Sequence, residues 1–345
     1  MGSEVKNKRI LQIGFGAFGE THAAAWSAIG CRSLTIADPN PAALARAAAL
    51  FPWAEQVADW RQALAQCQCV DILTPTDTHH SIAAAALDAG KDLFIEKPAT
   101  VTAAEAADLL SRQRRGGSVV QCGLYYRHHP KALALKAELA SGRLGRVRLM
   151  SGRFAGIKRA RRDSGALHND AVHFIDLFNW LSDELPQWVH AVTADHFARG
   201  LDDMAILQLG YPSGAKALIE TGYAQPGRWA DAVVPGAITS KEIAVSGTQG
   251  IAEVDFAAER FTIRRGSHRQ VNGLWQPEFA PPEEVSAAAA SAIDVLASEL
   301  RTFLGHVASR SAPETDLQAG GLVPARIIEA AIRSAENEQT VQLVW

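Results

Sequence analysis

Short apolar runs alternate with alanine-rich helical patterns over the first third of the chain. The runs, each with the length of a strand, lie at residues 9–14, 33–38, 70–76, 92–98 and 118–123. Strands that are buried on both faces read as continuous apolar runs, and helices between them form parallel crossovers. The pattern therefore predicts a doubly wound parallel sheet, whose last helix starts at a capping box formed by Thr102 and Glu105.

The pattern changes after residue 123. Helical patterns at 130–141 and 169–181 precede strand-like segments that have no crossover helices between them. These segments lie at residues 146–154, 188–195, 204–211, 215–223, 242–247, 251–256 and 261–266. Successive strands favour a mostly antiparallel sheet, and helices at 286–309 and 322–335 follow. We therefore predict an α/β fold with two domains: the doubly wound domain at 1–123 and, at 124–345, an α+β domain with a large open sheet.

The composition is that of an ordinary soluble globular protein. The 345 residues include 34 basic and 37 acidic side chains, so the formal charge is −3, and 48% of the residues are hydrophobic. A near-neutral chain is not typical of proteins devoted to nucleic acid, and no apolar stretch approaches the ~18 residues of a membrane span. The first residues are polar, and the four cysteines form no CxxC pair. We expect a cytoplasmic protein with no nucleic-acid or membrane partner.

A glycine-rich turn follows the first predicted strand. Gly14-Phe15-Gly16-Ala17-Phe18-Gly19 has the spacing G-x-G-x-x-G between a strand and a helix. In this setting the first glycine allows a tight turn, the second lets backbone approach a pyrophosphate, and the third lets helix and strand pack closely. Asp38 ends the next strand, where a carboxylate binds the adenosine ribose and repels a 2′-phosphate. We expect an NAD-binding Rossmann domain, with NADP still possible; the alternatives are a purely structural loop and a turn started by Asp38.

Polar residues also follow the later strands of this domain. Glu96-Lys97-Pro98 ends one strand, and Thr74-Pro75-Thr76 ends the strand before it. Ligands of open α/β sheets bind at these carboxyl ends, and a lysine there can donate to a substrate hydroxyl and stabilise alkoxide charge. The plainer interpretation of Lys97 is a solvated surface residue. His79 begins the following helix, and by its position alone it is a helix residue rather than a catalytic one.

A second polar group lies on the helix predicted at 169–181. Asn169, His173 and Asp176 recur at i, i+4 and i+7, and Asp170 lies beside His173. A histidine with carboxylate or amide neighbours is the usual build of a general acid or base. The helix is otherwise apolar nearly all round, so its polar groups need partners. The alternatives are a solvated face and a metal site; no second histidine pair has ligand spacing, and we expect no metal.

Together these motifs resemble the glucose–fructose oxidoreductase / inositol dehydrogenase / MocA family along nearly the whole chain. The similarity rests on the glycine loop, on T-P-x-x-x-H from Thr74 to His79, on Glu96-Lys97-Pro98 and on His173-x-x-Asp176. It implies NAD(P)-dependent oxidation or reduction of a sugar, cyclitol or similar alcohol, in a homodimer or homotetramer formed through the C-terminal sheet. It also implies that Lys97 polarises the reacting hydroxyl and that His173 takes its proton. The cofactor-binding positions it implies are Gly14, Phe15, Gly16, Ala17, Phe18, Gly19, Asp38, Thr74, Pro75, His79, Glu96 and Lys97.

One departure from the family pattern is Asn169, because many members carry an aspartate four residues before the catalytic histidine. An amide can hydrogen-bond a substrate but cannot stabilise an imidazolium by charge, so Asp170 or Asp176 would supply that charge. The candidate catalytic residues are Lys97, His173, Asn169 and Asp170. The candidate substrate-binding residues are Lys97, Tyr125, Arg127, Arg159, Asn169, Asp170 and His173.

The substrate is suggested by a basic run. Residues 143–162 carry eight basic residues and no acidic one. Arginine suits a pyrophosphate, and Arg162-Asp163-x-Gly165 is similar to nucleotide-sugar 3-dehydrogenases acting on UDP-N-acetylhexosamines. Three interpretations of the run stay open: a lid over an anionic substrate, a solvated loop and an oligomer contact. Trp229 either stacks on a sugar or base of the substrate or packs against the protein. Two other functions stay open: an imine or carbonyl reductase, and a non-catalytic NAD(H) sensor, which would need neither Lys97 nor His173.

Overall fold

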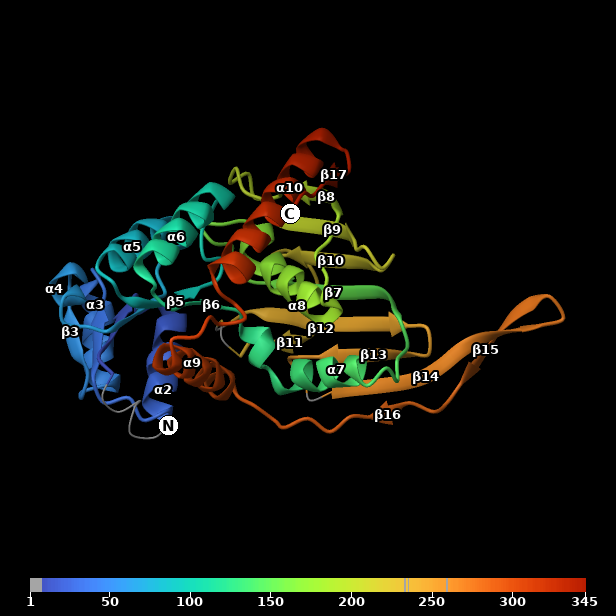
Figure 1. Cartoon of the computed structure of the whole chain (residues 1–345), viewed down its shortest axis with the longest axis horizontal. Coiled ribbons are helices and arrows are strands. Elements are labelled where there is room, and N and C mark those ends of the chain that lie inside the picture. Colours follow the sequence, from blue (N-terminus) through green and yellow to red (C-terminus); the bar gives the residue numbers. More distant parts are fainter. Residues whose placement is uncertain (1–7, 233, 235, 259) are drawn as a thin grey trace. The chain divides into compact units, whose positions relative to one another are not determined.

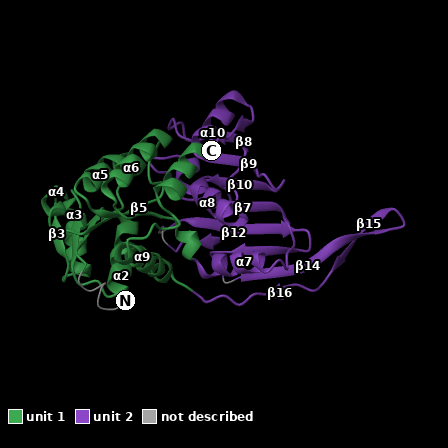
Figure 2. Ribbon diagram, viewed as in Figure 1, with its two compact units in different colours: residues 1–128, 290–326 green, residues 129–289, 327–345 purple. Residues whose placement is uncertain are grey.

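The structure is a computed structural model that describes residues 8–232, 234, 236–258 and 260–345 (Figure 1). The chain divides into two compact units (Figure 2). Unit 1 contains the chain up to residue 128 together with residues 290–326, and unit 2 contains residues 129–289 and 327–345. Residues 290–326, which the sequence pattern placed in the second domain, lie in unit 1, because the helix they form completes its core.

Unit 1 is built on a parallel sheet whose described strands follow the order β3-β2-β1-β4-β5-β6. The strands are β1 (Ile10–Ile13), β2 (Leu34–Ala37), β3 (Glu55–Val57), β4 (Cys69–Ile72), β5 (Asp92–Glu96) and β6 (Val120–Gly123). β1, β4, β5 and β6 are buried along their whole length, as the continuous apolar runs predict. The order is that of a doubly wound Rossmann sheet, so the predicted fold class is confirmed, with its switch point between β1 and β4. The short strand β3 at the sheet edge was not predicted.

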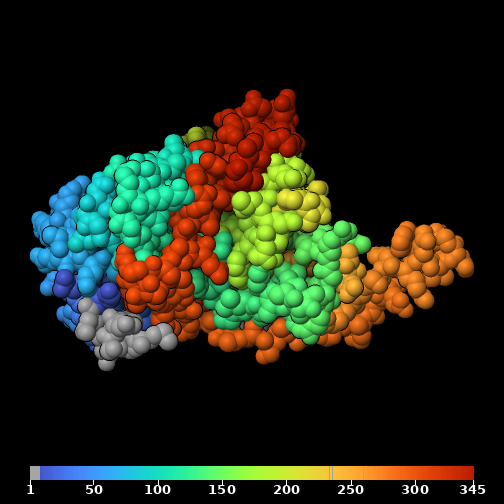
Figure 3. All heavy atoms as spheres, viewed as in Figure 1, coloured from blue at the N-terminus to red at the C-terminus, as the bar shows by residue number. Residues whose placement is uncertain are grey.

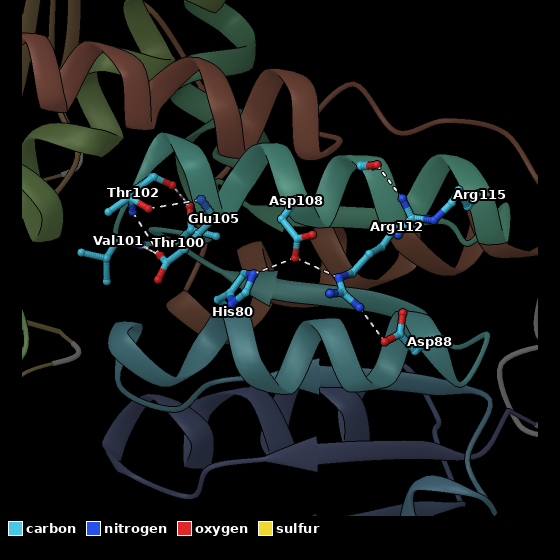
Figure 4. A network of polar contacts seen from close by, with 10 residues as sticks. His80, Asp88, Thr100, Val101, Thr102, Glu105, Asp108, Arg112 and Arg115 are labelled. Atoms are coloured by element: carbon cyan, nitrogen blue, oxygen red, sulfur yellow. Dashed lines mark hydrogen bonds and ion pairs between the residues drawn. The ribbon is translucent and has the colours of Figure 1, made fainter.

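Helices cover both faces of this sheet (Figure 1). One face carries α2 (Ala17–Ala28), α3 (Pro41–Leu50) and α9 (Ala292–Ser309); α2 packs against α9 around Trp26, Phe94 and Phe303. The other face carries α4 (Arg61–Leu64), α5 (Thr76–Asp88), α6 (Ala103–Gly116) and the π-helical turn η3 (Leu317–Leu322). The predicted capping box of α6 is confirmed: Thr102 Oγ1 accepts the Glu105 N–H (3.2 Å), and Glu105 Oε2 accepts the Thr102 N–H (3.1 Å) (Figure 4).

Unit 2 is built on a large sheet whose described strands follow the order β15-β14-β13-β12-β7-β10-β9-β8-β17. These are β7 (Val147–Ile157), β8 (Trp188–Ala194), β9 (Met204–Gly210), β10 (Lys216–Gly222), β12 (Ile238–Gly247), β13 (Gly250–Asp255), β14 (Arg260–Val271), β15 (Leu274–Phe279) and β17 (Val341–Gln342); the short strands β11 (Trp229–Ala230) and β16 (Glu283–Glu284) pair with β12 and β14. Neighbours are antiparallel except β7 and β10. This confirms the mostly antiparallel sheet.

The two faces of this sheet differ. On one face lies α8 (Val172–Ser182), which contacts β7 and β10; a Cβ added to Gly152 of β7 would lie 2.7 Å from the Phe174 ring, so the helix sits directly on the strand. The strand register places five exposed apolar side chains together on the opposite face: Leu149, Val192, Ile206, Leu218 and Ile251. Helix α7 (Pro130–Ala140) also belongs to unit 2, and α10 (Val323–Asn337) begins in unit 1 and continues in unit 2.

A two-stranded ribbon extends the sheet at β14 and β15 (Figures 1 and 3, orange). The sequence pattern ended this strand at residue 266, whereas β14 continues to Val271 and turns back into β15. Asn272 and Gly273 both have positive φ, which is the geometry of a tight hairpin turn. The pattern was wrong here because Leu274, Trp275 and Phe279 are exposed, so no buried face imposes an alternation on the strand.

Candidate functional site

The carboxyl ends of the parallel strands in unit 1 bring together residues that the sequence singled out. Gly14 follows β1, Asp38 follows β2, Thr74 lies just after β4 and Lys97 follows β5. Because the strands are parallel and adjacent, all four positions lie along one edge of the sheet. This is the edge at which open α/β sheets bind their ligands.

The glycine loop has a distinct geometry at each glycine. Gly14 has φ of +104°, and an added Cβ would lie 2.9 Å from the backbone carbon of Leu73. An added Cβ on Gly19 would overlap the carbonyl oxygen of Gly14, whereas one on Gly16 would meet open space. Gly16 is the N-cap of α2, so the helix begins at the open point of the loop. The loop thus offers bare backbone and a helix N-terminus, which is the cradle that a pyrophosphate requires.

Asp38 is fixed by backbone donors on two sides. Its Oδ2 accepts the Phe15 N–H and its Oδ1 accepts the Asn40 N–H, both at 2.8 Å. Arg46 donates to the Phe15 carbonyl oxygen (3.0 Å) and lies over the Phe15 ring. Asp38 therefore both starts the turn into α3 and holds the glycine loop, and each carboxylate oxygen keeps a lone pair for another donor.

His79 links two of the turns at the sheet edge. It is buried, with Nε2 2.8 Å from the Thr74 carbonyl oxygen and Nδ1 3.0 Å from the Pro98 carbonyl oxygen. Pro75 is the N-cap of α5, and the Lys97–Pro98 peptide bond is cis. The histidine is thus more than a helix residue, because it ties the turn after β4 to the turn after β5.

Lys97 begins the turn after β5. Glu96, the last residue of β5, pairs with Gly123 of β6, and its Oε2 accepts the Lys97 backbone N–H (3.1 Å). Tyr125 and Arg127 follow β6 in the short 3-10 helix η1 (Tyr125–His128). The candidate lysine and these two candidate substrate residues therefore leave neighbouring strands at the same edge.

The polar helix of unit 2 starts differently from the prediction. Residues Leu167–Ala171 form a π-helical turn, η2, and the α-helix proper begins at Val172. The assumed α-helical spacing from Asn169 to His173 is therefore wrong, because the π turn widens the first turn. His173 is nearly buried and stacks on Phe154 of β7, with ring centroids 5.4 Å apart. Single π turns of this kind are frequent at functional sites.

Asp170 is a member of a buried ion pair. Its Oδ2 lies 2.7 Å from Nζ of Lys158, and the two side chains are only 2% and 6% exposed. Its Oδ1 accepts a hydrogen bond from the Asn169 amide (2.8 Å). The Lys158 ammonium also lies over the Phe154 ring, 4.4 Å from its centroid. Asp170 therefore contacts Lys158 and Asn169, and the lysine charge reaches the ring on which His173 stacks.

The basic run is partly neutralised in unit 2. Four of its eight residues have acidic partners from outside the run: Arg143 with Glu138, Arg153 with Glu220, Lys158 with Asp170, and Arg161 with Asp163. Arg159 and Arg162 are exposed. Trp229 is 44% exposed and donates its indole N–H to Asp255 (2.8 Å). About half of the positive charge in the run is thus neutralised by acidic side chains that lie outside it.

Other site types have little support in the described part of the chain. No group of three or more His, Cys, Asp or Glu among the described residues is arranged to hold a metal ion. The four cysteines all lie in the described ranges, where they are buried and form no disulfide. A search of the described helices finds none with the length and apolar character of a membrane span.

Three polar residues that the sequence reading passed over lie in the core of unit 1. Gln12 is buried in β1, and its amide donates to the carbonyl oxygens of Gly14 (3.1 Å) and Gly19 (2.9 Å), which braces the glycine loop from below. Asp71 in β4 and His22 in α2 are likewise buried and in contact. The available signal was a polar residue in the middle of an apolar run, which requires a buried partner.

Comparison with known proteins agrees with this architecture. Residues 8–124 match the oxidoreductase family with an NAD-binding Rossmann fold, and residues 132–253 match the GFO/IDH/MocA C-terminal domain. An inositol 2-dehydrogenase of Acidothermus cellulolyticus is 30% identical over 58% of this chain and 60% of that protein. A levoglucosan dehydrogenase of Pseudarthrobacter phenanthrenivorans is 28% identical over 52% of each. The chain thus spans about half of the length of the curated relatives it matches.

Solved structures share the fold over nearly the whole chain. A levoglucosan dehydrogenase in complex with NADH and levoglucosan superposes with a TM-score of 0.83 at 22% identity, covering 98% of this chain and 100% of that one. A UDP-N-acetylglucosamine 3-dehydrogenase from Acidithiobacillus ferrooxidans gives 0.76 at 25% identity, covering 95% and 96%. With both of its domains matched, the chain belongs to the GFO/IDH/MocA family of oxidoreductases, and its first unit is an NAD-binding Rossmann domain.

Proposed function

We propose that the protein is an NAD-dependent oxidoreductase that transfers a hydride between nicotinamide and a secondary alcohol or ketone of a sugar or cyclitol. The observation that carries this proposal is a shared sheet edge, where a glycine loop shaped for a dinucleotide and Lys97 follow strands of one parallel sheet. Relatives named inositol 2-dehydrogenase and levoglucosan dehydrogenase support the same activity. Residues 1–123 would bind the cofactor, and residues 124–345 would bind the substrate and make subunit contacts.

The cofactor would be held by the residues of that edge. The loop from Gly14 through Phe15, Gly16, Ala17 and Phe18 to Gly19 offers backbone N–H groups to the pyrophosphate. Asp38, already oriented by the Phe15 N–H, accepts the ribose hydroxyls and repels a 2′-phosphate, so NAD is favoured over NADP. Thr74, Pro75, His79, Glu96 and Lys97 form the neighbouring wall. When bound, NAD supplies the acceptor for the hydride.

Two side chains would handle the reacting hydroxyl. Lys97 donates a hydrogen bond to it and stabilises the alkoxide charge that develops as the proton leaves. His173 accepts that proton at a ring nitrogen and returns it in the reverse direction. Asn169 hydrogen-bonds the substrate, and Asp170 holds the Asn169 amide in place. Because Lys158 already neutralises Asp170, this aspartate acts by position more than by charge.

The substrate class we favour is an uncharged polyol. Four residues of the basic run are paired within unit 2, which removes much of the charge that a pyrophosphate would need. Tyr125 and Arg127 at the end of β6 would contact sugar hydroxyls. A nucleotide sugar is the second candidate, because Arg159 and Arg162 are exposed and a UDP-N-acetylglucosamine 3-dehydrogenase shares the architecture.

The open face of the unit 2 sheet would join subunits. Its exposed apolar side chains include one on each of the four neighbouring strands β7, β10, β9 and β8, and a group of exposed apolar side chains marks a protein interface. A second copy of the chain, in a homodimer or homotetramer, is the partner we propose. Leu218→Glu in the middle of this face should convert the oligomer to monomer in light scattering, and an unchanged mass would remove this part of the proposal.

Nicotinamide absorbance against inositols, free and anhydro sugars, UDP-sugars and ketones tests the activity. Lys97→Met and His173→Asn should each lower kcat by about 100-fold or more on whichever substrate responds. Lys91→Met is the matched control, since Lys91 precedes β5 at the opposite edge of the same sheet, and it should leave kcat unchanged. Parent-like turnover by both site variants would refute the assignment. Turnover of UDP-sugars but not of free polyols would replace the favoured substrate class.

Cofactor choice is tested by two substitutions of Asp38. Asp38→Ala removes both the ribose acceptor and the partner of the Phe15 N–H, so the Kd for NADH should rise about 10-fold or more. Asp38→Asn keeps an acceptor for Phe15 and removes only the charge, so it should mainly improve binding of NADPH. An unchanged ratio of the two Kd values in both variants would contradict the proposed selectivity.

A further inference from the structure

Three ionisable side chains form a closed cluster inside unit 1. His22 of α2 is fully buried, with Nδ1 3.1 Å from Asp71 Oδ2 and Nε2 3.3 Å from Glu96 Oε1. Asp71 lies in the middle of β4 and Glu96 at the end of β5, so the imidazole bridges two neighbouring strands. The side chains of Asp71 and Glu96 are 1% and 8% exposed.

The geometry favours a charged imidazole. Ionised carboxylate oxygens only accept, so the form of the ring that suits two carboxylates, at 3.1 and 3.3 Å, is the one with a proton on each nitrogen. Burial lowers the pKa of an imidazole, but here Asp71 and Glu96 outweigh burial and raise the pKa of His22 to about 10. The other groups around the ring carry no charge: the rings of Phe18 and Phe94 pack against it, and the Trp26 indole N–H donates to the same Asp71 oxygen (2.7 Å).

The cluster ends at the turn that carries Lys97. The second carboxylate oxygen of Glu96 accepts the Lys97 backbone N–H (3.1 Å). On its other side the Glu96 carboxylate lies against Gly123 of β6, where an added Cβ would be 2.5 Å from Oε1. Glu96 thus contacts His22, the backbone of Lys97 and the surface of a glycine.

Packing alone does not account for such a cluster. The surrounding core is apolar, and replacing a buried ion pair or triad with apolar side chains of similar volume is often neutral or stabilising. His22 also stands one turn into α2, the helix that begins at the glycine loop. A charged bridge at this point connects the helix of the cofactor loop to the turn that carries the lysine.

We propose that His22 is a positioning residue, which clamps Glu96 from below and thereby fixes the Glu96–Lys97 turn, so that the Lys97 ammonium is held where the reacting hydroxyl binds. The inference rests on the proposed function, because it assumes that Lys97 touches the substrate. Asp71 anchors the far side of the imidazolium, and Gly123 leaves the space into which the Glu96 carboxylate fits.

His22→Gln tests the inference, because the amide keeps much of the volume and removes the charge. Misplacing Lys97 should lower kcat by about 10- to 100-fold, while KM for the substrate and Kd for NADH stay within about threefold. The matched control is His80→Gln: His80 also pairs with a carboxylate, Asp108 (2.9 Å), but on the partly exposed surface between α5 and α6 (Figure 4). The control should keep the parent kcat.

Gly123→Ala gives an independent arm. Its Cβ would overlap the Glu96 carboxylate while the His22 side chain itself is unchanged, and it should reproduce the selective loss of kcat. A folded His22→Gln enzyme whose kcat matches that of His80→Gln would overturn the inference. A loss of kcat that is fully explained by a smaller folded fraction of the variant would overturn it as well. If His22→Gln does not fold, Gly123→Ala decides, and an unchanged kcat refutes the positioning role. Lys97→Met distinguishes failure of the positioning role from failure of the proposed function, because a Lys97→Met enzyme that retains activity refutes the proposed function itself.

Discussion

Removing one partner of the buried pair in unit 2 should destabilise the protein strongly. Lys158→Met keeps the length of the side chain but leaves the Asp170 carboxylate buried without its cation. At the 2.7 Å separation, the attraction is about 6 kcal/mol for an effective dielectric constant of ~20. Breaking a buried pair from one side costs about 3–5 kcal/mol, because the remaining charge keeps its desolvation penalty.

Scanning calorimetry provides the assay. At pH 7 the loss of about 3–5 kcal/mol should lower Tm of unit 2 by about 6–20 °C. Lys158→Met combined with Asp170→Asn should be more stable than the single variant at pH 7, because neither charge remains. Arg228→Met, which breaks the exposed pair with Glu242, should cost less than about 1 kcal/mol. The reasoning is refuted if Lys158→Met costs no more than this control, or if adding Asp170→Asn does not reduce its cost.

Three further outcomes follow from the structure. Raising the pH from about 6.5 to about 10 should lower the free energy of unfolding of unit 1 by about 1.4 kcal/mol per pH unit. The reason is the raised pKa of His22, because the stabilisation from its proton is complete below about pH 6.5 and is lost as the pH approaches 10. In calorimetry, His22→Gln should lack this part of the pH dependence. Gly165→Ala should cost about 1–3 kcal/mol in urea unfolding, since its Cβ would overlap the Asp202 carboxylate that caps η2, and an unchanged midpoint would contradict the packing described. Ser291→Ala should cost about 0.5–2 kcal/mol, because the hydroxyl accepts the Asp294 N–H at the start of α9, and a Tm equal to the parent's would exclude that cap as a contributor.

The parts of the fold that the sequence predicted are those governed by local rules. The Rossmann half follows from continuous apolar runs and from a loop whose three glycines each meet a different steric demand. The capping box of α6 was readable for the same reason, since its two residues are three positions apart. Features of this kind need no knowledge of which segments meet in space.

The features that the sequence did not reveal depend on distant partners. The basic run at 143–162 looked uniformly positive, but Glu220 neutralises Arg153 from a strand 67 positions away. His22 stood out only as a polar residue in an apolar run, and its partners could not be identified because Asp71 and Glu96 come from two later strands. The π turn η2 was missed since helical periodicity cannot distinguish one widened turn from an ordinary one. The same limit applies to α9, whose role in unit 1 depends on packing against α2.

Unit 1 is formed by two separate segments of the chain, and this affects how it folds during synthesis. Its sheet is finished by residue 123, but α9, which brings Leu296, Leu300 and Phe303 to the core, is encoded far downstream. At about 5–20 residues per second, a ribosome would need roughly 10–40 s to pass from residue 128 to residue 326. During that interval the nascent Rossmann half exposes an apolar face around Trp26 and Phe94. We therefore expect a chaperone to bind this apolar face during synthesis, until residues 290–326 emerge and α9 covers it.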